Sequence, residues 1–600
     1  MSNPIGATVI AQALQQLDVN IIFGLVGLPV TDIAEQAIDL GIRFIGFRNE
    51  QAASYAATAY GFLTGKPGVC LLVGGPGVIH GMAGIANASA NAWPTLFLGG
   101  SSETSLWTKG GFQEMDAITL LTPHTKRAIR PHTNTADAIT SAIHDAYRIC
   151  WYGRPGPTFV DLPTDFIMTP VKSTKSISRP PVSALSKPIA SFEVVAAATK
   201  LLKSATAPLV IIGKGAAYAQ AEQPIRALIN GSHLPFLPTP MGKGVVPDSH
   251  PLNTSSARSV ALREADVVLL LGARLNWILH HAAAPKYRKD VKIIQVDISP
   301  EELGRSNSIG EPALSIFGDI GLVVDQLTTS LAGWKAFPSS SIHASTSNST
   351  FAQKLSNSAS KNETAAHKLA SSPTQPGKPL TFERAFHIIK QTLHSISGPE
   401  NGDVVYIGEG SQTMDISRSI FPLDHPRQKL DAGTYATMGV GLAYCIAAWS
   451  AYNLPRKTKK LVALEGDSAL GFAAMEIETM HRHEMDVLVF CMNNSGIYSG
   501  DTADKADWEA KQQRLLNGSG SSKSRDRLKS SSLMHEARYE QLATMVGGRG
   551  IFVRTEQELE SATREGYAEG RVTVVNVIIE PGNDKNMSFA WMDTKAKSKM

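Results

Sequence analysis

Short hydrophobic runs rich in β-branched residues alternate with longer segments of helical periodicity along most of this chain. A short, continuous apolar run bounded by turn residues is typical of a strand that is buried on both faces. Strands that alternate with helices indicate βαβ units, so the pattern predicts α/β domains with parallel sheets. The strand candidates lie at residues 20–24, 42–47, 68–73, 95–98, 158–162, 208–212, 266–271, 292–297, 403–407, 461–464, 486–492 and 573–579.

The strand candidates fall into three blocks that are separated by stretches of different composition. We therefore predict three doubly wound parallel-sheet domains, of which the first and third could share one topology. A stretch rich in Pro, Ser and Lys, residues 169–188, separates the first two blocks and predicts a linker. The predicted domains span residues 1–180, 190–335 and 380–580, and a C-terminal lid and targeting tail follows at 581–600.

Two further stretches are rich in Ser and poor in large apolar residues. Residues 338–379 lack enough apolar surface to order themselves by burial, so we predict a disordered linker there. Residues 517–532, with the sequence NGSGSSKSRDRLKSSS, predict a surface loop inside the third domain.

Composition excludes several classes of protein. Hydrophobic residues make up 43% of the 600 positions, and the net charge of +4 is spread along the chain, which gives no case for nucleic acid. The longest uncharged stretch, Gly433–Leu454, contains several Gly and polar residues and predicts a turn and a buried helix, so no membrane span is expected. The N-terminus lacks the basic residue of a signal peptide, and four scattered cysteines do not form a disulfide or zinc pattern. The sequence therefore predicts a soluble protein.

Two neighbouring strands of the third block end in polar residues. The strand Lys460–Leu464 runs into Glu465, Gly466, Asp467 and Ser468, and the strand 486–492 ends in Asn493, Asn494, Ser495 and Gly496. The helix predicted between them, at residues 472–483, makes this a βαβ unit, whose strands are parallel and end at the same edge of the sheet. Asp467 and Asn494 should therefore converge. A carboxylate, an amide oxygen and a free carbonyl are ligands that Mg²⁺ prefers, and a nearby helix start can receive a diphosphate.

The segment from Gly466 to Tyr498 resembles the thiamine diphosphate motif of the pyruvate decarboxylase and acetolactate synthase superfamily. The resemblance implies that Asp467, Asn494 and the carbonyl of Gly496 hold magnesium. Residues 430–441 resemble the part that grips the aminopyrimidine, with Met438 as the apolar prop that bends the cofactor. The expected cofactor contacts are Glu50, Ser411, Gln412, Thr413, Met438, Gly441, Gly466, Asp467, Ser468, Asn494 and Tyr498.

Glu50 follows a strand of the first block and precedes a helix that begins at Gln51. A glutamate in this place can simply complement the helix dipole. The local sequence, however, resembles the pyrimidine-binding domain of the superfamily, and this implies that Glu50 protonates the cofactor ring and so promotes removal of the thiazolium proton. In the superfamily the two halves of the site come from two subunits, so we expect a homodimer or a homotetramer.

Strings in the middle block resemble oxalyl-CoA decarboxylase and 2-hydroxyacyl-CoA lyase, and this similarity covers nearly the whole chain except the two Ser-rich inserts. In those relatives the middle block holds an adenine nucleotide, which assigns Lys214 and Arg274 to phosphates and Asp297 to ribose hydroxyls of bound ADP. The alternative is that these are surface charges at strand ends.

Three further segments predict how the substrate is bound and where its protons are transferred. Arg418 lies where the relatives place an arginine that reaches CoA phosphate, although an arginine in a helix is more often solvated. The loop 110–114 resembles the lyase form, so Gln113 and Glu114 are candidates for proton transfer, with Tyr498 nearby. The segment 587–591 also resembles the end of the lyase, or it forms a generic lid.

The favoured function is a thiamine diphosphate-dependent lyase that cleaves a 2-hydroxyacyl-CoA to formyl-CoA and an aldehyde shortened by one carbon. The alternative, oxalyl-CoA decarboxylase, gives formyl-CoA and carbon dioxide and needs no base for a 2-hydroxyl proton. A third hypothesis is a cofactor-binding partner protein that has lost catalysis, but the presence of Glu50, Asp467 and Asn494 argues against it.

The chain ends in Ser598, Lys599 and Met600, close to the Ser-Lys-Leu peroxisomal address. This predicts import by the peroxisomal receptor, which suits the shortening of 2-hydroxy fatty acyl-CoAs. A cytoplasmic location is the alternative.

Overall fold

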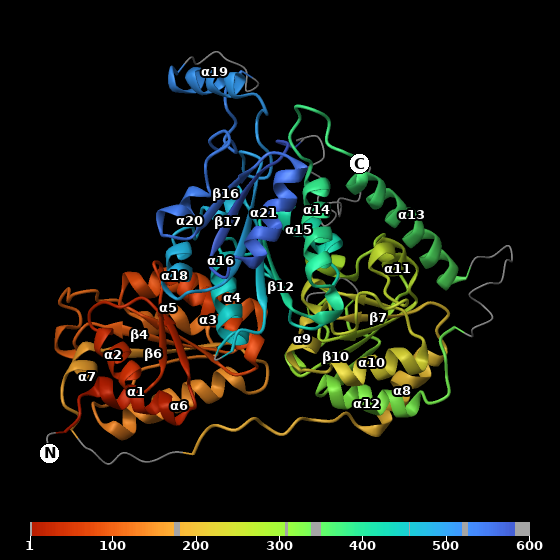
Figure 1. Ribbon diagram of the computed structural model, residues 1–600. Coiled ribbons are helices and arrows are strands. Elements are labelled where there is room, and N and C mark those ends of the chain that lie inside the picture. Colours follow the sequence, from red (N-terminus) through yellow and green to blue (C-terminus); the bar gives the residue numbers. More distant parts are fainter. Residues whose placement is uncertain are drawn as a thin grey trace.

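The computed structural model describes residues 3–172, 180–305, 310–337, 350–454, 456–518 and 526–582. They contain three sheets, in which every pair of named strands is parallel. Each sheet belongs to its own α/β domain, and the third domain lies above the other two in Figure 1. The predicted fold class of three parallel-sheet domains is therefore confirmed.

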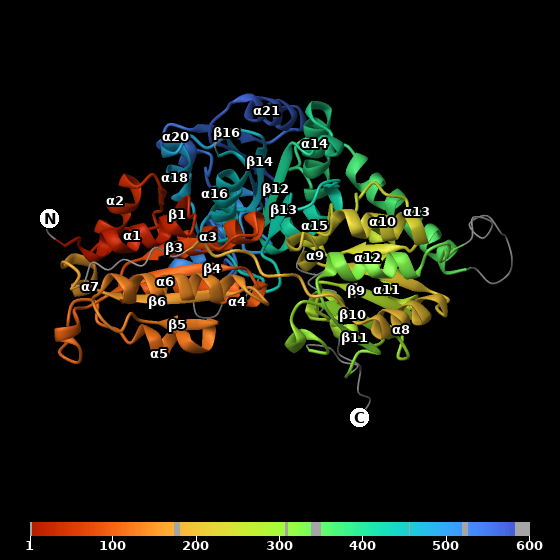
Figure 2. The same cartoon turned by 90° about the horizontal axis from the view of Figure 1, so that it is seen from below.

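The first domain contains a six-stranded sheet in the order β2-β1-β3-β4-β6-β5. Its central strands are apolar and buried on both faces, because helices cover the sheet from both sides (Figure 2). The strands are β1 Ile21–Gly24, β2 Arg43–Gly46, β3 Gly68–Leu72, β4 Thr95–Ser101, β5 Arg127–Ile129 and β6 Pro157–Pro163. The helices are α1 Gly6–Gln16, α2 Thr31–Asp39, α3 Glu50–Thr64, α4 Pro76–Asn91, α5 Ala117–Leu121, α6 Ala136–Trp151 and α7 Thr164–Met168.

The second domain contains a five-stranded sheet in the order β11-β10-β9-β7-β8. The strands are β7 Pro208–Ile212, β8 Phe236–Pro238, β9 Val267–Leu271, β10 Lys292–Asp297 and β11 Leu314–Phe317. The helices are α8 Phe192–Lys203, α9 Lys214–Tyr218, α10 Glu222–Ser232, α11 Arg258–Glu264 and α12 Ile320–Ser330.

The third domain contains a six-stranded sheet in the order β13-β12-β14-β15-β17-β16. The strands are β12 Val404–Glu409, β13 Lys429–Asp431, β14 Lys460–Gly466, β15 Val487–Asn493, β16 Arg549–Val553 and β17 Thr573–Ile578. The helices are α14 Phe382–Ile396, α15 Ser411–Ile420, α16 Gly441–Tyr452, α17 Asp467–Leu470, α18 Glu476–Arg482, α19 Lys505–Leu516, α20 Gln541–Met545 and α21 Glu556–Ala568.

The first and third sheets have the same strand order, which confirms that these two domains share one topology. Helix α3 follows β2, and α16 follows β13, at equivalent places in the two sheets. These two helices pack against each other, and their buried residues belong to one apolar cluster that also extends into the second domain. The three domains are therefore joined through a common core.

Two predictions about local structure need correction. Residues 351–371, inside the predicted disordered linker 338–379, form helix α13, Phe351–Ser371. Phe351 and Leu355 are buried against the apolar cluster beneath α11 of the second domain, so two apolar residues order a segment whose overall composition is polar. The helix predicted at 472–483 is also shorter, since α18 begins at Glu476.

The four cysteines are buried and free. Within the described ranges, no helix is long and apolar enough to cross a membrane. The uncharged stretch at 433–454 instead contains the buried helix α16.

We expect Leu355→Ala to detach α13 from the second domain, because truncation of a buried leucine costs about 2 to 5 kcal/mol. Hydrogen exchange followed by mass spectrometry should show faster exchange across residues 351–371. Leu369→Ala is the matched control, since Leu369 is on the same helix but exposed. Equal protection of α13 in both variants would contradict this anchoring.

Candidate cofactor and active site

The ends of β14 and β15 bring the predicted metal ligands together. The two strands are paired in parallel, with Gly466 opposite Met492, so both leave the sheet at the same edge. The amide of Gly496 donates to Asp467 Oδ2 and to Asn494 Oδ1, each at 3.1 Å. The carboxylate and the amide oxygen therefore meet at one backbone group, although 27 positions separate them in the sequence.

Burial gives this site its electrostatic character. Asp467 is almost fully buried, and the loss of solvation raises the pKa of its carboxyl group to about 7, even though the amides of Ser468 and Gly496 stabilise the charged form. Asp467 forms no ion pair with a described residue. A buried carboxylate without a cation beside an amide oxygen and a backbone carbonyl fits a divalent ion such as Mg²⁺. The described part of the chain offers no cluster of three or more His, Cys, Asp or Glu side chains as a competing site.

Two glycines bring the backbones of β12 and β14 close together at the same edge. Gly410 has a φ of +88°, and a Cβ on it would lie 3.3 Å from the amide nitrogen of Gly466. Helix α15 begins directly after Gly410, so the backbone of Ser411 and Gln412 lies at its N-terminus beside the metal site. Thr413 is buried, and Gln412 Oε1 has no hydrogen-bond partner among the described residues. Free amides at a helix start and an unpartnered amide oxygen fit the predicted cofactor contacts.

The loop predicted to grip the aminopyrimidine is held by a residue that the sequence analysis missed. Glu409, the last residue of β12, accepts hydrogen bonds from the amides of Gly439 and Gly441, which flank the turn after Met438. Burial raises the pKa of Glu409 to about 7. On the neighbouring strand it lies opposite Glu465, which is also buried. The sequence did contain a signal for this pair, since Glu409 and Glu465 each follow an apolar run that predicts a buried strand.

Glu50 is the first residue of α3, but it does not cap the helix. Asn49 does so by accepting a hydrogen bond of 2.7 Å from the amide of Gln51. Glu50 is only 7% exposed, and its Oε2 lies 3.1 Å from Nδ1 of His80 on α4. Glu50 still lies in the first turn of α3, where a carboxylate complements the helix dipole, and its contact with His80 comes in addition. His80 is a second residue that the sequence analysis missed.

The first and third domains meet close to Glu50. The amide of Arg48 donates to Glu476 on α18 at 3.1 Å, and the Arg48 guanidinium lies 3.4 Å from Glu478. Glu50 itself forms no hydrogen bond or ion pair with a described residue of the third domain. Within one chain, the structure thus shows Glu50 paired with His80 and does not show it bonded to the metal-site residues.

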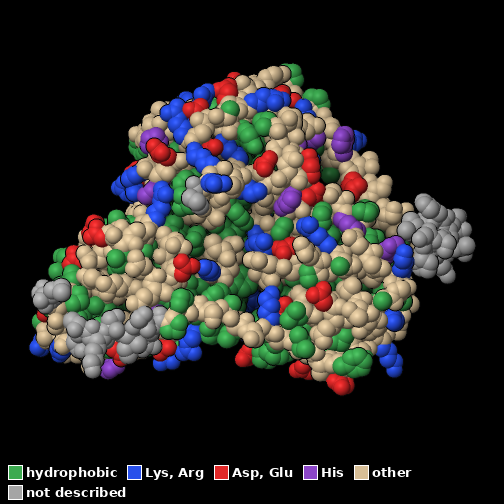
Figure 3. Space-filling view, turned by 60° about the horizontal axis from the view of Figure 1, so that its bottom comes forward, with side chains coloured by type: hydrophobic (Ala, Val, Ile, Leu, Met, Phe, Trp, Pro, Cys, Tyr) green, Lys and Arg blue, Asp and Glu red, His purple; other side chains and the backbone are tan. Residues whose placement is uncertain are grey.

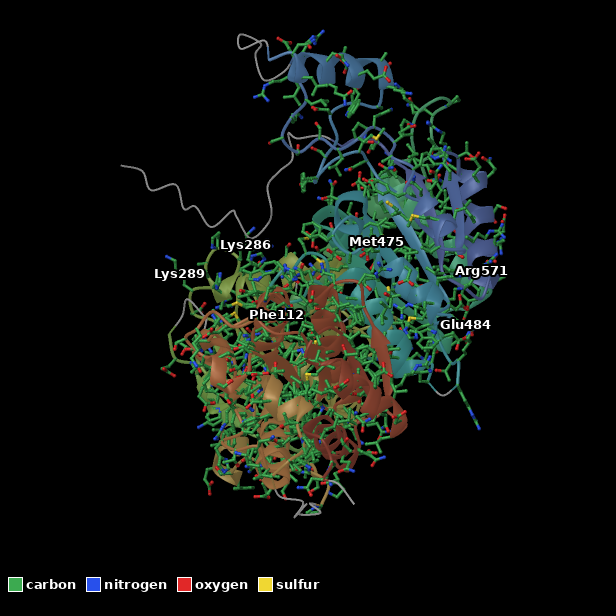
Figure 4. The ribbon with its side chains drawn as sticks, turned by 90° about the vertical axis from the view of Figure 1, so that its left-hand side faces the viewer. Phe112, Lys286, Lys289, Met475, Glu484 and Arg571 are labelled. Carbon is green, nitrogen blue, oxygen red and sulfur yellow. The ribbon has the colours of Figure 1, made fainter. Side chains whose placement is uncertain are left out.

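The loop before α5 shows how its predicted residues are held. Glu114 accepts hydrogen bonds from the amides of Thr108, Gly110 and Gly111, and these donors lower its pKa. Gln113 has a φ of +54°, and its Oε1 is buried without a described partner. The preceding residue, Phe112, projects from this loop and is 67% exposed (Figure 4).

Tyr498 lies at the metal motif, in the left-handed region with a φ of +70°. Its carbonyl accepts a hydrogen bond of 3.0 Å from Asn494 Nδ2. The position of Tyr498 is therefore coupled to a predicted metal ligand.

A cavity of about 980 Å³ lies between the three domains. It contains all three residues predicted to hold a nucleotide, Lys214, Arg274 and Asp297, and it also contains Arg154 of the first domain. Burial raises the pKa of Asp297 to about 6. Lys214 Nζ donates to Asn91 and to Thr434, which belongs to the loop after β13. The charges are thus cavity-lining groups and not dispersed surface charges.

Comparison with known proteins supports the same division of the chain. Residues 5–120 match the profile "Thiamine pyrophosphate enzyme, N-terminal TPP binding domain", residues 195–327 the central domain and residues 408–577 the C-terminal TPP binding domain. Mus musculus 2-hydroxyacyl-CoA lyase 1 is 42% identical over 98% of this chain and 96% of its own length. Escherichia coli (strain K12) oxalyl-CoA decarboxylase is 37% identical over 96% of this chain and 95% of its own length.

The chain belongs to the 2-hydroxyacyl-CoA lyase and oxalyl-CoA decarboxylase family of thiamine pyrophosphate enzymes. A second lyase relative, Saccharomyces cerevisiae (strain ATCC 204508 / S288c) 2-hydroxyacyl-CoA lyase, is 38% identical over 97% of this chain and 98% of its own length. Membership explains why the first and third domains share one topology, since both match TPP binding domains.

Arg418, which the sequence analysis assigned to a CoA phosphate, bonds to two aspartates of its own domain. Its Nε donates to Asp431 at 2.8 Å, and its Nη1 donates to Asp415 at 2.7 Å. A guanidinium has five N–H donors, so these two contacts leave donors on Nη1 and Nη2 for a further acceptor. The predicted lid at 587–591 and the terminal Ser598, Lys599 and Met600 lie outside the described residues.

We expect Asp467→Asn to weaken magnesium-dependent binding of thiamine diphosphate by more than about 10-fold. Mutation of a residue that only supports a metal ligand already lowers metal affinity by about 10-fold, and a direct ligand should matter more. Isothermal titration calorimetry with the cofactor and Mg²⁺ measures the change. Asp39→Asn, at the exposed end of α2, is the control. Unchanged affinity in the Asp467 variant would remove this residue from the metal site.

Proposed function

We propose that this protein is a thiamine diphosphate- and magnesium-dependent lyase that cleaves a 2-hydroxyacyl-CoA to formyl-CoA and an aldehyde shortened by one carbon. The observation that carries the proposal is the convergence of Asp467, Asn494 and Gly496 at one sheet edge in a chain that is 42% identical to 2-hydroxyacyl-CoA lyase 1 over nearly its whole length.

Each part of the site has a role in this reaction. Asp467, Asn494 and the carbonyl of Gly496 would hold the magnesium ion, and the backbone at Gly410 and Gly466 would lie along the diphosphate. Thiamine diphosphate, when bound, would supply a nucleophilic carbon for the thioester carbonyl and an electron sink for the carbon–carbon bond that breaks. Glu50 holds a proton for the ring nitrogen of the cofactor, and its burial beside His80 keeps bulk water from competing for it.

Departure of an aldehyde requires that the 2-hydroxyl group lose its proton. We assign this proton handling to the loop of Gln113 and Glu114 together with Tyr498. Glu114 has a lowered pKa and stays ionised at neutral pH, but its oxygens already accept loop amides, so its first effect is to shape the loop. Gln113, whose Oε1 has no described partner, can accept a hydrogen bond from the substrate hydroxyl, and the carboxylate of Glu114 is the member of this pair that can take up its proton.

We further propose that the active site is completed in a homodimer or homotetramer. Several large apolar side chains around the two half-sites are exposed, and monomeric proteins seldom expose large apolar patches. Figure 3 shows hydrophobic side chains gathered at the centre of one face, where the domains meet. The exposed residues near the half-sites are Ile79, Phe112, Tyr435, Phe472, Met475 and Ile497.

The cavity between the domains supports a nucleotide such as ADP as a second ligand. Its volume suits a small molecule, and among its charged lining residues Lys214 and Arg274 match phosphates while Asp297 matches ribose hydroxyls. Peroxisomal import, by contrast, depends on residues that the structure does not describe, so this location and the role in fatty acid α-oxidation stay predictions.

The decisive experiment supplies purified protein, thiamine diphosphate and Mg²⁺ with a long-chain 2-hydroxyacyl-CoA and, separately, with oxalyl-CoA. We expect formyl-CoA and a shortened aldehyde from the first substrate, and a loss of at least about 100-fold in kcat in Glu50→Gln, since general acid–base groups contribute this much. Carbon dioxide from oxalyl-CoA without aldehyde from the other substrate would favour the decarboxylase. Cofactor binding without turnover of either thioester would favour an inactive partner protein.

For the nucleotide, we expect Arg274→Gln to weaken ADP binding by about 10-fold or more, because one charge-assisted hydrogen bond contributes about 1.5 to 3 kcal/mol. Calorimetric titration with ADP measures this change. Arg263→Gln is the control, since Arg263 is an exposed arginine of the same domain outside the cavity. Equal affinity in both variants would argue against a nucleotide at this place.

A further inference from the structure

Helix α4 presents a histidine to the carboxylate that the proposed reaction depends on. His80 Nδ1 lies 3.1 Å from Glu50 Oε2, a hydrogen-bonding distance. The two side chains differ in environment: the Glu50 side chain is 9% exposed, whereas the His80 side chain is 59% exposed in the single chain. The contact therefore has one buried partner, unlike a surface ion pair, which usually contributes little.

At Gly77, helix α4 places no side chain against the other carboxylate oxygen of Glu50. The helix begins with Pro76 and Gly77, and a Cβ on Gly77 would lie 3.1 Å from Glu50 Oε1 and 2.4 Å from a methyl group of Val73. Glycine thus leaves space beside Oε1, while His80, one turn further along the helix, occupies Oε2. The two oxygens of Glu50 are held in different surroundings by the same helix.

We propose that His80 is a positioning residue for Glu50: its Nδ1–H donates to Oε2, fixes the rotamer of the carboxyl group and leaves Oε1 for the ring nitrogen of the cofactor. This inference rests on the proposed function, because it requires that Glu50 act on thiamine diphosphate. A carboxyl group that protonates a ring must keep one oxygen aimed at it, and a mobile side chain would lose much of the benefit of proximity.

The chemistry of imidazole suits this task. The ring can donate from Nδ1 and remain a neutral molecule, so it orients the carboxylate without placing a permanent cation beside it. A lysine or arginine at the same place would hold the carboxylate in its charged form. Asparagine is the closest substitute, since its amide nitrogen can donate from nearly the same distance along the side chain.

The test measures the exchange of the cofactor C2 proton for deuterium in the assembled holoenzyme, by acid quench and NMR. We expect His80→Leu to slow this exchange by about 10- to 100-fold, the usual effect of removing a group that orients a functional ligand. The affinity for thiamine diphosphate should change far less. His80→Asn should restore most of the exchange rate, because it restores the donor.

His132→Leu is the matched control, an exposed histidine of the same domain. Glu50→Gln distinguishes failure of the role proposed for Glu50 from failure of the role proposed for His80. If this variant exchanges the C2 proton at the wild-type rate, the proposed role of Glu50 fails. If Glu50→Gln is slow but His80→Leu is as fast as wild type, only the role of His80 is overturned. Equal loss of exchange and of cofactor binding in His80→Leu and His80→Asn would show a merely structural role and also overturn it.

Discussion

The parallel pairing of β14 with β15 is the constraint on which the site depends. It places the end of one strand, at Asp467, beside the end of the other, at Asn494, and the single amide of Gly496 bonds to both side chains. A carboxylate buried without an ion-pair partner is costly, and its raised pKa reflects that cost. A divalent cation would offset this cost, which is the physical reason for proposing a metal at this edge of the sheet.

The first and third domains have equivalent parallel sheets, and this equivalence places two of their helices against each other. Both have the same strand order, and the equivalent helices α3 and α16 pack together in one apolar cluster. Glu50 begins one of these helices, and Gly441, which is bonded to Glu409, begins the other. Glu50 and the loop predicted to grip the cofactor are thus fixed to the same pair of packed helices, which limits how far either can move alone.

Helix α4 connects two regions that differ in chemistry. Its N-terminal half lies against Glu50 through His80, and its C-terminal end offers the carbonyl of Ala90 to Arg274 and the side chain of Asn91 to Lys214. Both cations line the cavity between the domains. A rigid helix therefore spans the distance from the predicted nucleotide cavity to the catalytic carboxylate.

Sequence alone predicted the central strands, the fold class and the convergence of Asp467 with Asn494, because buried parallel strands have a strong apolar signal and their ends must share an edge. It missed β5, β8, β11, β13 and β16, each of which lies at the edge of its sheet, where the apolar signal is weaker. It did not reveal His80 or Glu409. A histidine on a helix and a glutamate at a strand end acquire their roles only from what packs against them. Likewise α13 has a polar composition, and only the apolar cluster beneath α11 showed that Phe351 and Leu355 could anchor this helix. Tertiary structure also decided that Arg418 is paired with two aspartates. Local pattern specifies which elements form, whereas contacts between residues far apart in sequence decide which polar groups are free to act.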